Sequence, residues 1–276
     1  MRYAITLGLI SLVTLSACGG GAAAEEVEFR SGEATLHAVL FKPEGPGPFP
    51  AVVGLHGCNG LMKRSGQLGA RYRDWGERLS AAGFAVLYPD SFAARGLGPQ
   101  CTVRDRRARS SRERLDDANA ARRWLQAQSW VKPDRVMLVG WSSGATSALW
   151  TVRPHAAARD GHPDFRSAVA FYPGCRRLSD LAWSARIPTL ILIGAEDDWT
   201  PASACQTMIR EARGRSAFAE IVVYPGAFHS FDHPNQPVTQ RTGLAFSADG
   251  SGRAHVATHA QARADALKRV PEWLAR

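Results

Sequence analysis

The sequence predicts an α/β fold with a mostly parallel central sheet and helices on both faces. Short apolar runs such as Ala51–Leu55, Val136–Val139 and Thr189–Ile193 are typical of parallel strands that are buried on both sides. Segments with helical periodicity lie between these runs, as in alternating α/β chains. One of the runs leads directly into Gly140-Trp141-Ser142-Ser143-Gly144, a pattern typical of a sharp strand-to-helix turn.

The first residues resemble an export signal. Arg2 gives a positive start, and Ala4–Leu15 forms an apolar region that is too short for a membrane-spanning helix. Leu15-Ser16-Ala17-Cys18 resembles a bacterial lipobox, in which the cysteine becomes the lipidated first residue of the mature protein.

We therefore expect a signal peptide at 1–17, a flexible tether at 18–26 and a single domain at 27–276. Lipidation of Cys18 would anchor the protein to the bacterial envelope, on the periplasmic side. We expect the outer membrane, because the absence of an aspartate directly after the cysteine resembles lipoproteins that are sent there. Cleavage near Ala22-Ala23-Ala24, which would release a free soluble protein, is the alternative.

Length and composition fit one large globular domain. The 276 residues are 45% hydrophobic and 21% charged, with a formal net charge of +9. The arginines are densest in Arg104–Arg123, where acidic residues separate them, so we interpret this segment as a solvated helix face. We expect no nucleic-acid partner.

Four cysteines remain once Cys18 is set aside. An even number fits disulfide bonding in an oxidising compartment, but three pairings are possible. We favour Cys58–Cys101 and Cys175–Cys205, because each pair would join segments at the carboxyl ends of neighbouring strands. The cysteines are not spaced as in a zinc site, and we expect no metal.

The first half of the chain predicts an antiparallel sheet edge followed by alternating strands and helices. Val27–Arg30 and Thr35–Phe41 are the edge strands, and Lys42–Pro50 is a turn rich in proline and glycine. The elements that follow are a strand at Ala51–Leu55, a helix at Tyr72–Ala82, a strand at Phe84–Leu87 and a helix at Leu115–Gln128. We expect His56, after the first of these, to shape its loop.

The Gly-Trp-Ser-Ser-Gly turn predicts a nucleophile at Ser142. A buried strand precedes it, and the small residues after Gly144 allow a helix to pack closely against that strand. The pattern alone is short, and glycine-serine turns are common, so the prediction needs an acid and a histidine further along the chain.

Both partners follow later strands. Asp197 comes after the strand Thr189–Ile193, and His229 comes after the strand Ile221–Tyr224. Since carboxyl ends of parallel strands meet at one sheet edge, we expect both side chains to lie near Ser142. A strand at Ser167–Phe171 and a helix at Ala254–Lys268 complete the fold.

At these positions the chain resembles the dienelactone hydrolase family of α/β-hydrolases. The matching motifs are GWSSG, GAEDDWTP and YPGAFHSF, and the family's spacing to the proline selects Asp197 over Glu196 and Asp198, which we interpret as solvated or as loop hydrogen-bond partners. The best-known members have cysteine at the elbow. Ser142 therefore keeps the expectation of a hydrolase but not of dienelactone as its substrate.

The resemblance implies hydrolysis of a small ester or lactone without a cofactor. Backbone N–H groups of Cys58 and Ser143 would form the oxyanion hole. Arg95 and Trp141 are candidate substrate contacts, with a surface role as the alternative for Arg95. A peptidase, thioesterase or acyltransferase would use the same side chains, and a non-catalytic binding protein would share only the fold.

Three further histidines carry a different interpretation. The segment His229–His233 has a metal-like pattern, but Pro234 argues against a helical ligand pair. His255 and His259 have helical spacing, and without a third ligand nearby we interpret them as surface residues.

Overall fold

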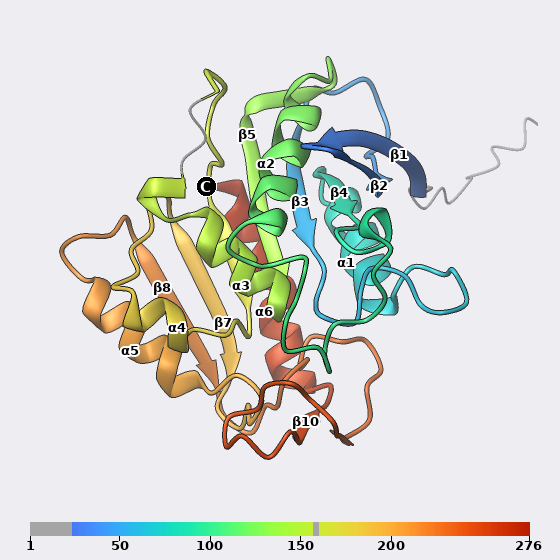
Figure 1. Ribbon diagram of the computed structural model, residues 1–276. Helices are drawn as coiled ribbons and strands as arrows, with labels where there is room; N and C mark the ends of the chain where they lie inside the picture. Colours follow the sequence, from blue (N-terminus) through green and yellow to red (C-terminus); the bar gives the residue numbers. More distant parts are fainter. Residues whose placement is uncertain (1–23, 157–159) are drawn as a thin grey trace, which may run out of the picture.

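The computed structural model describes residues 24–156 and 160–276 (Figure 1). The predicted signal peptide, the lipobox and Cys18 lie outside the described residues. The chain forms an eight-stranded sheet in the order β1-β2-β4-β3-β5-β6-β7-β8. The strands are β1 (Ala24–Ser31), β2 (Ala34–Phe41), β3 (Phe49–Leu55), β4 (Ala85–Pro89), β5 (Val131–Trp141), β6 (Ala168–Phe171), β7 (Thr189–Gly194) and β8 (Ala219–Tyr224).

The sheet is parallel from β4 to β8. β2 alone runs in the opposite direction, so it pairs antiparallel with both β1 and β4, and β1 and β2 form one edge of the sheet, as the sequence predicts. β4, β5, β6 and β7 are buried along the residues that pair, in agreement with their uninterrupted apolar runs. The predicted fold class is confirmed.

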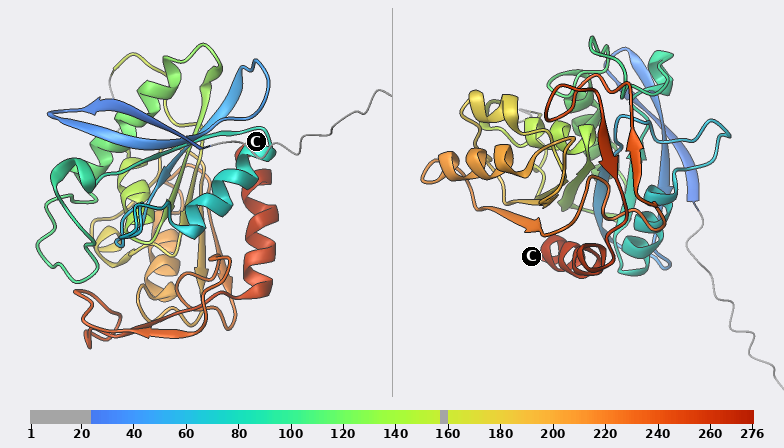
Figure 2. Two further views of the ribbon diagram at one scale, coloured as in Figure 1. Left: turned by 90° about the vertical axis from the view of Figure 1, so that its right-hand side faces the viewer. Right: turned by 90° about the horizontal axis from the view of Figure 1, so that it is seen from below.

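Helices cover both faces of this sheet. Figure 2 shows α1 and α6 on one face and the other four helices on the opposite face. The helices are α1 (Ala70–Ala81), α2 (Glu113–Gln126), α3 (Ser143–Thr151), α4 (Arg176–Asp180), α5 (Ala202–Ala212) and α6 (Ala260–Ala275). Among the described residues, no helix combines the length and the apolar character that a membrane crossing requires.

Two expected boundaries are wrong. The strand β1 begins at Ala24, so residues 24–26 of the predicted tether pair with β2. Ala254–Val256, expected to start the last helix, instead forms strand β10, which pairs with β9 (Thr239–Arg241). The helix α6 begins only after His259, whose side chain accepts a hydrogen bond from the Ala262 N–H, and it continues through Pro271.

Both predicted disulfides are present. Cys58 pairs with Cys101 at a Cα–Cα distance of 4.9 Å, and Cys175 pairs with Cys205 at 5.0 Å. The first bond joins the loop after β3 to the segment between β4 and α2, and the second joins the segment after β6 to α5. Each therefore fixes a segment next to the carboxyl edge of the sheet.

Candidate active site

The turn between β5 and α3 has the backbone geometry of a nucleophile elbow. Ser142 lies between the strand and the helix with φ 54° and ψ −118°, an unfavourable region for a residue with a side chain. A Cβ on Gly144 would lie 2.0 Å from the Leu55 carbonyl oxygen, and one on Gly140 would lie 2.4 Å from the Gly144 carbonyl oxygen. The two glycines are required because strand, turn and helix pack so closely.

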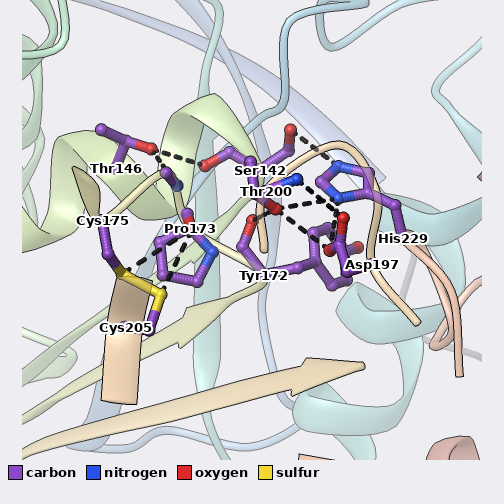
Figure 3. Close-up of a disulfide and its surroundings, with 10 residues drawn as sticks. Ser142, Thr146, Tyr172, Pro173, Cys175, Asp197, Thr200, Cys205 and His229 are labelled. Atoms are coloured by element: carbon purple, nitrogen blue, oxygen red, sulfur yellow. Dashed lines mark hydrogen bonds and ion pairs between the residues drawn. A yellow bond between two sulfur atoms is a disulfide. The ribbon is translucent and has the colours of Figure 1, made fainter. Parts of the chain in front are cut away.

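The structure brings Ser142, His229 and Asp197 together. His229 Nε2 lies 3.0 Å from Ser142 Oγ, and His229 Nδ1 lies 2.8 Å from Asp197 Oδ2. Figure 3 shows the imidazole between the hydroxyl and the carboxylate. Asp197 and His229 are 3% and 1% exposed, so their contact is shielded from water. The proton on Nδ1 faces the carboxylate, and Nε2 is left to accept from the serine hydroxyl.

Backbone and hydroxyl donors hold the Asp197 carboxylate. Oδ1 accepts hydrogen bonds from the N–H groups of Trp199 (3.0 Å) and Thr200 (2.8 Å). Thr200 Oγ1 lies 3.0 Å from Oδ2 and 3.2 Å from His229 Nδ1. These donors fix the direction in which the carboxylate faces the imidazole.

Two aromatic rings flank the imidazole. The ring centroid of Tyr172 lies 4.4 Å from that of His229, and the centroid of Trp199 lies 4.8 Å away. The backbone of the histidine loop is also fixed, since the Ala257 N–H donates to the His229 carbonyl oxygen at 3.1 Å. The imidazole therefore has little freedom to rotate away from Ser142.

The loop after β3 approaches the serine closely. A Cβ placed on Gly57 would lie 3.5 Å from Ser142 Cβ. Tyr72 supports this loop, because its hydroxyl accepts the Gly57 N–H at 2.8 Å. No acceptor within the described parts of the chain binds the N–H of Cys58 or Ser143.

His56 shapes this loop, as the sequence predicts. Its ring is fully buried, with Nδ1 2.8 Å from the Gly57 carbonyl oxygen and Nε2 accepting the Ser91 N–H at 3.2 Å. Burial, with a contribution from the nearby Arg114 charge, lowers the pKa of His56 to about 3. The ring is neutral at physiological pH, and both of its nitrogens bind partners other than Ser142.

A cleft of about 560 Å³ opens above the serine. Ser142, His229 and Trp199 lie in its wall beside Gly57 and Cys58. Cationic side chains also line it, and these are Lys63, Arg64, Arg71 and Arg241. The volume is that of a small-molecule site.

The structure places the two candidate substrate contacts, Arg95 and Trp141, outside the cleft. Both terminal nitrogens of Arg95 bind the Asp117 carboxylate, at 2.8 and 2.9 Å, because a buried carboxylate on α2 needs a paired charge. Trp141 is 0% exposed, and its side chain points into the core beneath the elbow. Neither residue lines the cleft that contains Ser142.

Asp198 and His255 form a pair beside the site. His255 Nδ1 lies 2.7 Å from Asp198 Oδ2, and the His255 N–H donates to Oδ1 at 2.7 Å. Asp198 is thus a loop hydrogen-bond partner, one of the two roles expected for it. In the described part of the chain, no cluster of three or more His, Cys, Asp or Glu side chains could hold a metal ion.

Sequence reasoning missed Asp232, which supports the site from below. Its carboxylate is 0% exposed and accepts hydrogen bonds from Trp75, Trp141 and Tyr172, at 2.8, 2.8 and 2.6 Å. In the sequence, Asp232 lies within His229–His233, a segment whose pattern resembles only a metal motif.

Comparison with known proteins identifies a family for this chain. The family model of the dienelactone hydrolase family matches residues 36–276. An Escherichia coli (strain K12) protein named "Putative carboxymethylenebutenolidase" is 24% identical over 208 residues, which is 70% of this chain and 72% of that protein. A Bradyrhizobium protein named "Probable 2-oxo-3-(5-oxofuran-2-ylidene)propanoate lactonase" is 26% identical over 223 residues, or 73% and 80% of the two chains.

A solved structure shares the fold. The crystal structure titled "Putative Dienelactone Hydrolase" from Klebsiella pneumoniae superposes with a TM-score of 0.68 at 23% identity, and the match covers 93% of this chain and all of that one. The family match begins within β2 and spans every strand from β3 to β8. The chain therefore belongs to the dienelactone hydrolase family and is a carboxylic ester hydrolase.

Proposed function

We propose that the protein hydrolyses a small carboxylic ester or lactone through an acyl-enzyme on Ser142. The observation that carries this proposal is the pair of contacts on His229, 3.0 Å to the serine hydroxyl and 2.8 Å to the Asp197 carboxylate. A serine hydroxyl is a weak nucleophile at neutral pH, so a base must take its proton as it attacks. His229 is that base, and Asp197 stabilises the imidazolium that forms.

The attack converts the ester carbonyl into a tetrahedral intermediate with a negatively charged oxygen. The N–H groups of Cys58 and Ser143 bind this oxygen. Two observations support this assignment. Ser143 follows Ser142 directly, and Cys58 follows Gly57, where a Cβ would lie 3.5 Å from Ser142 Cβ. Neither N–H has an acceptor within the described parts of the chain. His229 then protonates the departing alcohol oxygen, which leaves the acyl group on Ser142.

Water completes the cycle. His229 removes a proton from a water molecule as that water attacks the acyl-enzyme, and the acid leaves when Ser142 regains the proton. The names of the two relatives above, a butenolidase and a lactonase, support a lactone or a similar small ester as substrate. The cleft of about 560 Å³ fits a molecule of that size.

Covalent labelling tests this mechanism. A fluorophosphonate probe should label the wild-type protein once, at the peptide that contains Ser142, and should fail to label Ser142→Ala. Absence of labelling in the folded wild type would instead favour a binding protein on a hydrolase fold. Turnover of p-nitrophenyl acetate, measured beside an aminoacyl p-nitroanilide, separates an esterase from a peptidase.

We also propose a cellular location for the protein. The protein is exported to the periplasm and anchored to the bacterial envelope by a lipid on Cys18. The lipobox-like sequence supports this, and so do the two disulfides, which persist in oxidising compartments. Cys18→Ala should stop incorporation of an alkyne-labelled fatty acid and move the protein to the soluble fraction. Wild type that carries no fatty acid would contradict the anchor.

A further inference from the structure

We propose that Arg114 is the positioning residue of the oxyanion hole. The structure assigns it two tasks: it holds together the two backbone segments that carry the Cys58 and Ser143 N–H groups, and it places a positive charge behind them. This inference rests on the oxyanion hole of the proposed function. Arg114 does not line the cleft, so it acts through the two segments and not on the substrate.

Arg114 lies in the first turn of α2 and is 1% exposed. Its Nη2 donates a hydrogen bond to the His56 carbonyl oxygen, and its Nη1 donates to Ser143 Oγ at 3.0 Å. His56 immediately precedes Gly57 and Cys58, while Ser143 is the first residue of α3. One rigid planar guanidinium therefore fixes the spacing between the two donor segments.

The charge of Arg114 is not neutralised by an adjacent carboxylate. Within the described parts of the chain, no carboxylate oxygen lies within ion-pair distance, and its buried Nε has no hydrogen-bond partner. Asp117, in the next turn of α2, is instead occupied by Arg95. A buried cation without a paired carboxylate costs stability, and such costs are concentrated at functional sites.

The Arg114 side chain is charged at neutral pH, which supports this interpretation. Burial lowers the pKa of Arg114 to about 10, with Asp117 and Asp90 acting in the opposite direction, so the guanidinium still carries its charge at neutral pH. In the proposed mechanism the negative oxygen of the tetrahedral intermediate forms at the Cys58 N–H, two residues after the His56 carbonyl group that binds Arg114. A fixed positive charge there stabilises the transition state more than the neutral ester.

Arg122 provides a matched control on the same helix. It is 0% exposed, its Nη1 donates to the Pro163 carbonyl oxygen, and its guanidinium lies over the Phe165 ring at 5.7 Å, much as that of Arg114 lies over Phe92 at 5.3 Å. Arg122 differs from Arg114 in two ways: it forms an ion pair with Asp160 at 2.8 Å, and it lies about two helical turns further along α2.

The experiment compares Arg114→Met, Arg114→Lys and Arg122→Met with the wild-type protein. For each variant, kcat and KM for p-nitrophenyl acetate are measured, together with the inhibition constant of a trifluoromethyl ketone, which forms an oxyanion when serine adds to it. Thermal unfolding reports folding separately. We expect Arg114→Met to lower kcat/KM by about 10- to 100-fold and to weaken the ketone by a similar factor, with KM changed less than about threefold.

The control and the conservative variant should behave differently. Arg122→Met should lose thermal stability but keep kcat/KM within about threefold of wild type, and Arg114→Lys should recover part of the activity because it keeps the charge. A folded Arg114→Met with kcat/KM and ketone affinity equal to those of Arg122→Met would overturn the inference. So would a loss confined to KM, because it would indicate a substrate contact.

Ser143→Ala keeps the test decisive if Arg114→Met does not fold. It removes only the hydroxyl that accepts from Arg114 and retains the Ser143 N–H. We expect Ser143→Ala to lower kcat by about 5- to 10-fold. In the double variant Ser143→Ala/Arg114→Lys, the fold-loss of kcat should be smaller than the product of the two single losses, because both changes remove the same contact. Full activity of Ser143→Ala and Arg114→Lys would overturn the inference. Failure of the wild type to be labelled by a fluorophosphonate would, by contrast, refute the proposed function itself.

Discussion

The carboxylate of Asp232 accepts a hydrogen bond at 2.8 Å from the indole N–H of Trp141, the residue just before Ser142. Asp232 lies three residues after His229, in the loop that carries the imidazole. This single bond therefore links the segment that carries the nucleophile to the segment that carries its base. The Tyr172 hydroxyl and the Trp75 indole N–H donate to the same carboxylate.

Replacement of Asp232 by asparagine should destabilise the protein. Asparagine replaces one carboxylate oxygen by an NH₂ group, which cannot accept a hydrogen bond. In one amide orientation the two indole N–H groups lose their acceptor, and in the other the Tyr172 hydroxyl and Arg71 lose theirs. We expect the free energy of unfolding in urea to fall by about 3–5 kcal/mol. Asp164→Asn is the control, since its ion pair with Arg186 is partly exposed and should contribute about 1 kcal/mol or less. Equal losses of unfolding free energy in the two variants would show that the buried network around Asp232 stabilises the protein no more than the partly exposed ion pair does.

The two disulfides should stabilise the fold similarly but affect activity differently. Their sequence separations of 43 and 30 residues predict about 3–4 kcal/mol each on the chain-entropy model. Only Cys58 belongs to the proposed oxyanion hole. We expect Cys58→Ala/Cys101→Ala to lower kcat about 10-fold at a temperature where both variants are folded, while Cys175→Ala/Cys205→Ala keeps its kcat. An unchanged kcat in the first variant would separate the disulfide from catalysis.

His56 should make stability depend on pH. Its pKa is about 3 in the folded protein and 6.5 for an unperturbed histidine, so below pH 6.5 the unfolded chain binds a proton that the folded protein excludes. Stability from this residue is complete above pH 6.5 and is lost as pH falls toward 3. At pH 5 the loss should be about 2 kcal/mol. His56→Gln, although less stable throughout, should show a shallower decline between pH 7 and 5, and parallel curves would contradict the assignment.

Thr200 should affect turnover without affecting substrate binding. Its hydroxyl lies 3.0 Å from Asp197 Oδ2 and 3.2 Å from His229 Nδ1, and therefore helps to fix the direction of the carboxylate. Thr200→Val, which keeps the shape, should lower kcat about 10-fold with KM nearly unchanged. Thr200→Ser retains the hydroxyl and should stay close to wild type. A normal kcat in Thr200→Val would contradict this role and would show that the backbone N–H groups of Trp199 and Thr200 suffice to orient the Asp197 carboxylate.

The parts of the site that are local in sequence were predictable. The elbow glycines, Asp197 and His229 follow strands whose apolar runs are unmistakable, and parallel strands place their carboxyl ends along one edge. Even the disulfide partners follow from this geometry. Such features require only the order of elements along the chain.

The supporting contacts were not predictable, because they depend on how distant side chains meet. Arg95 follows a strand, as a substrate-binding arginine would, but Asp117 on α2 captures it. Ala254–Val256 has helical neighbours, yet it pairs as a strand with Thr239–Arg241, since Asp198 holds the backbone of His255. In each case a tertiary partner decided the outcome over the local pattern.

The most direct test is to trap the acyl group. Wild-type protein is mixed with p-nitrophenyl acetate, quenched in acid within the first turnover and digested for mass spectrometry. With trypsin as the protease, we expect one acetyl group at Ser142, on the peptide 136–159, and a burst of p-nitrophenol equal to the enzyme concentration. Active enzyme that releases p-nitrophenol while Ser142 stays unmodified at every quench time, and while Ser142→Ala turns over at the wild-type rate, would contradict a serine nucleophile.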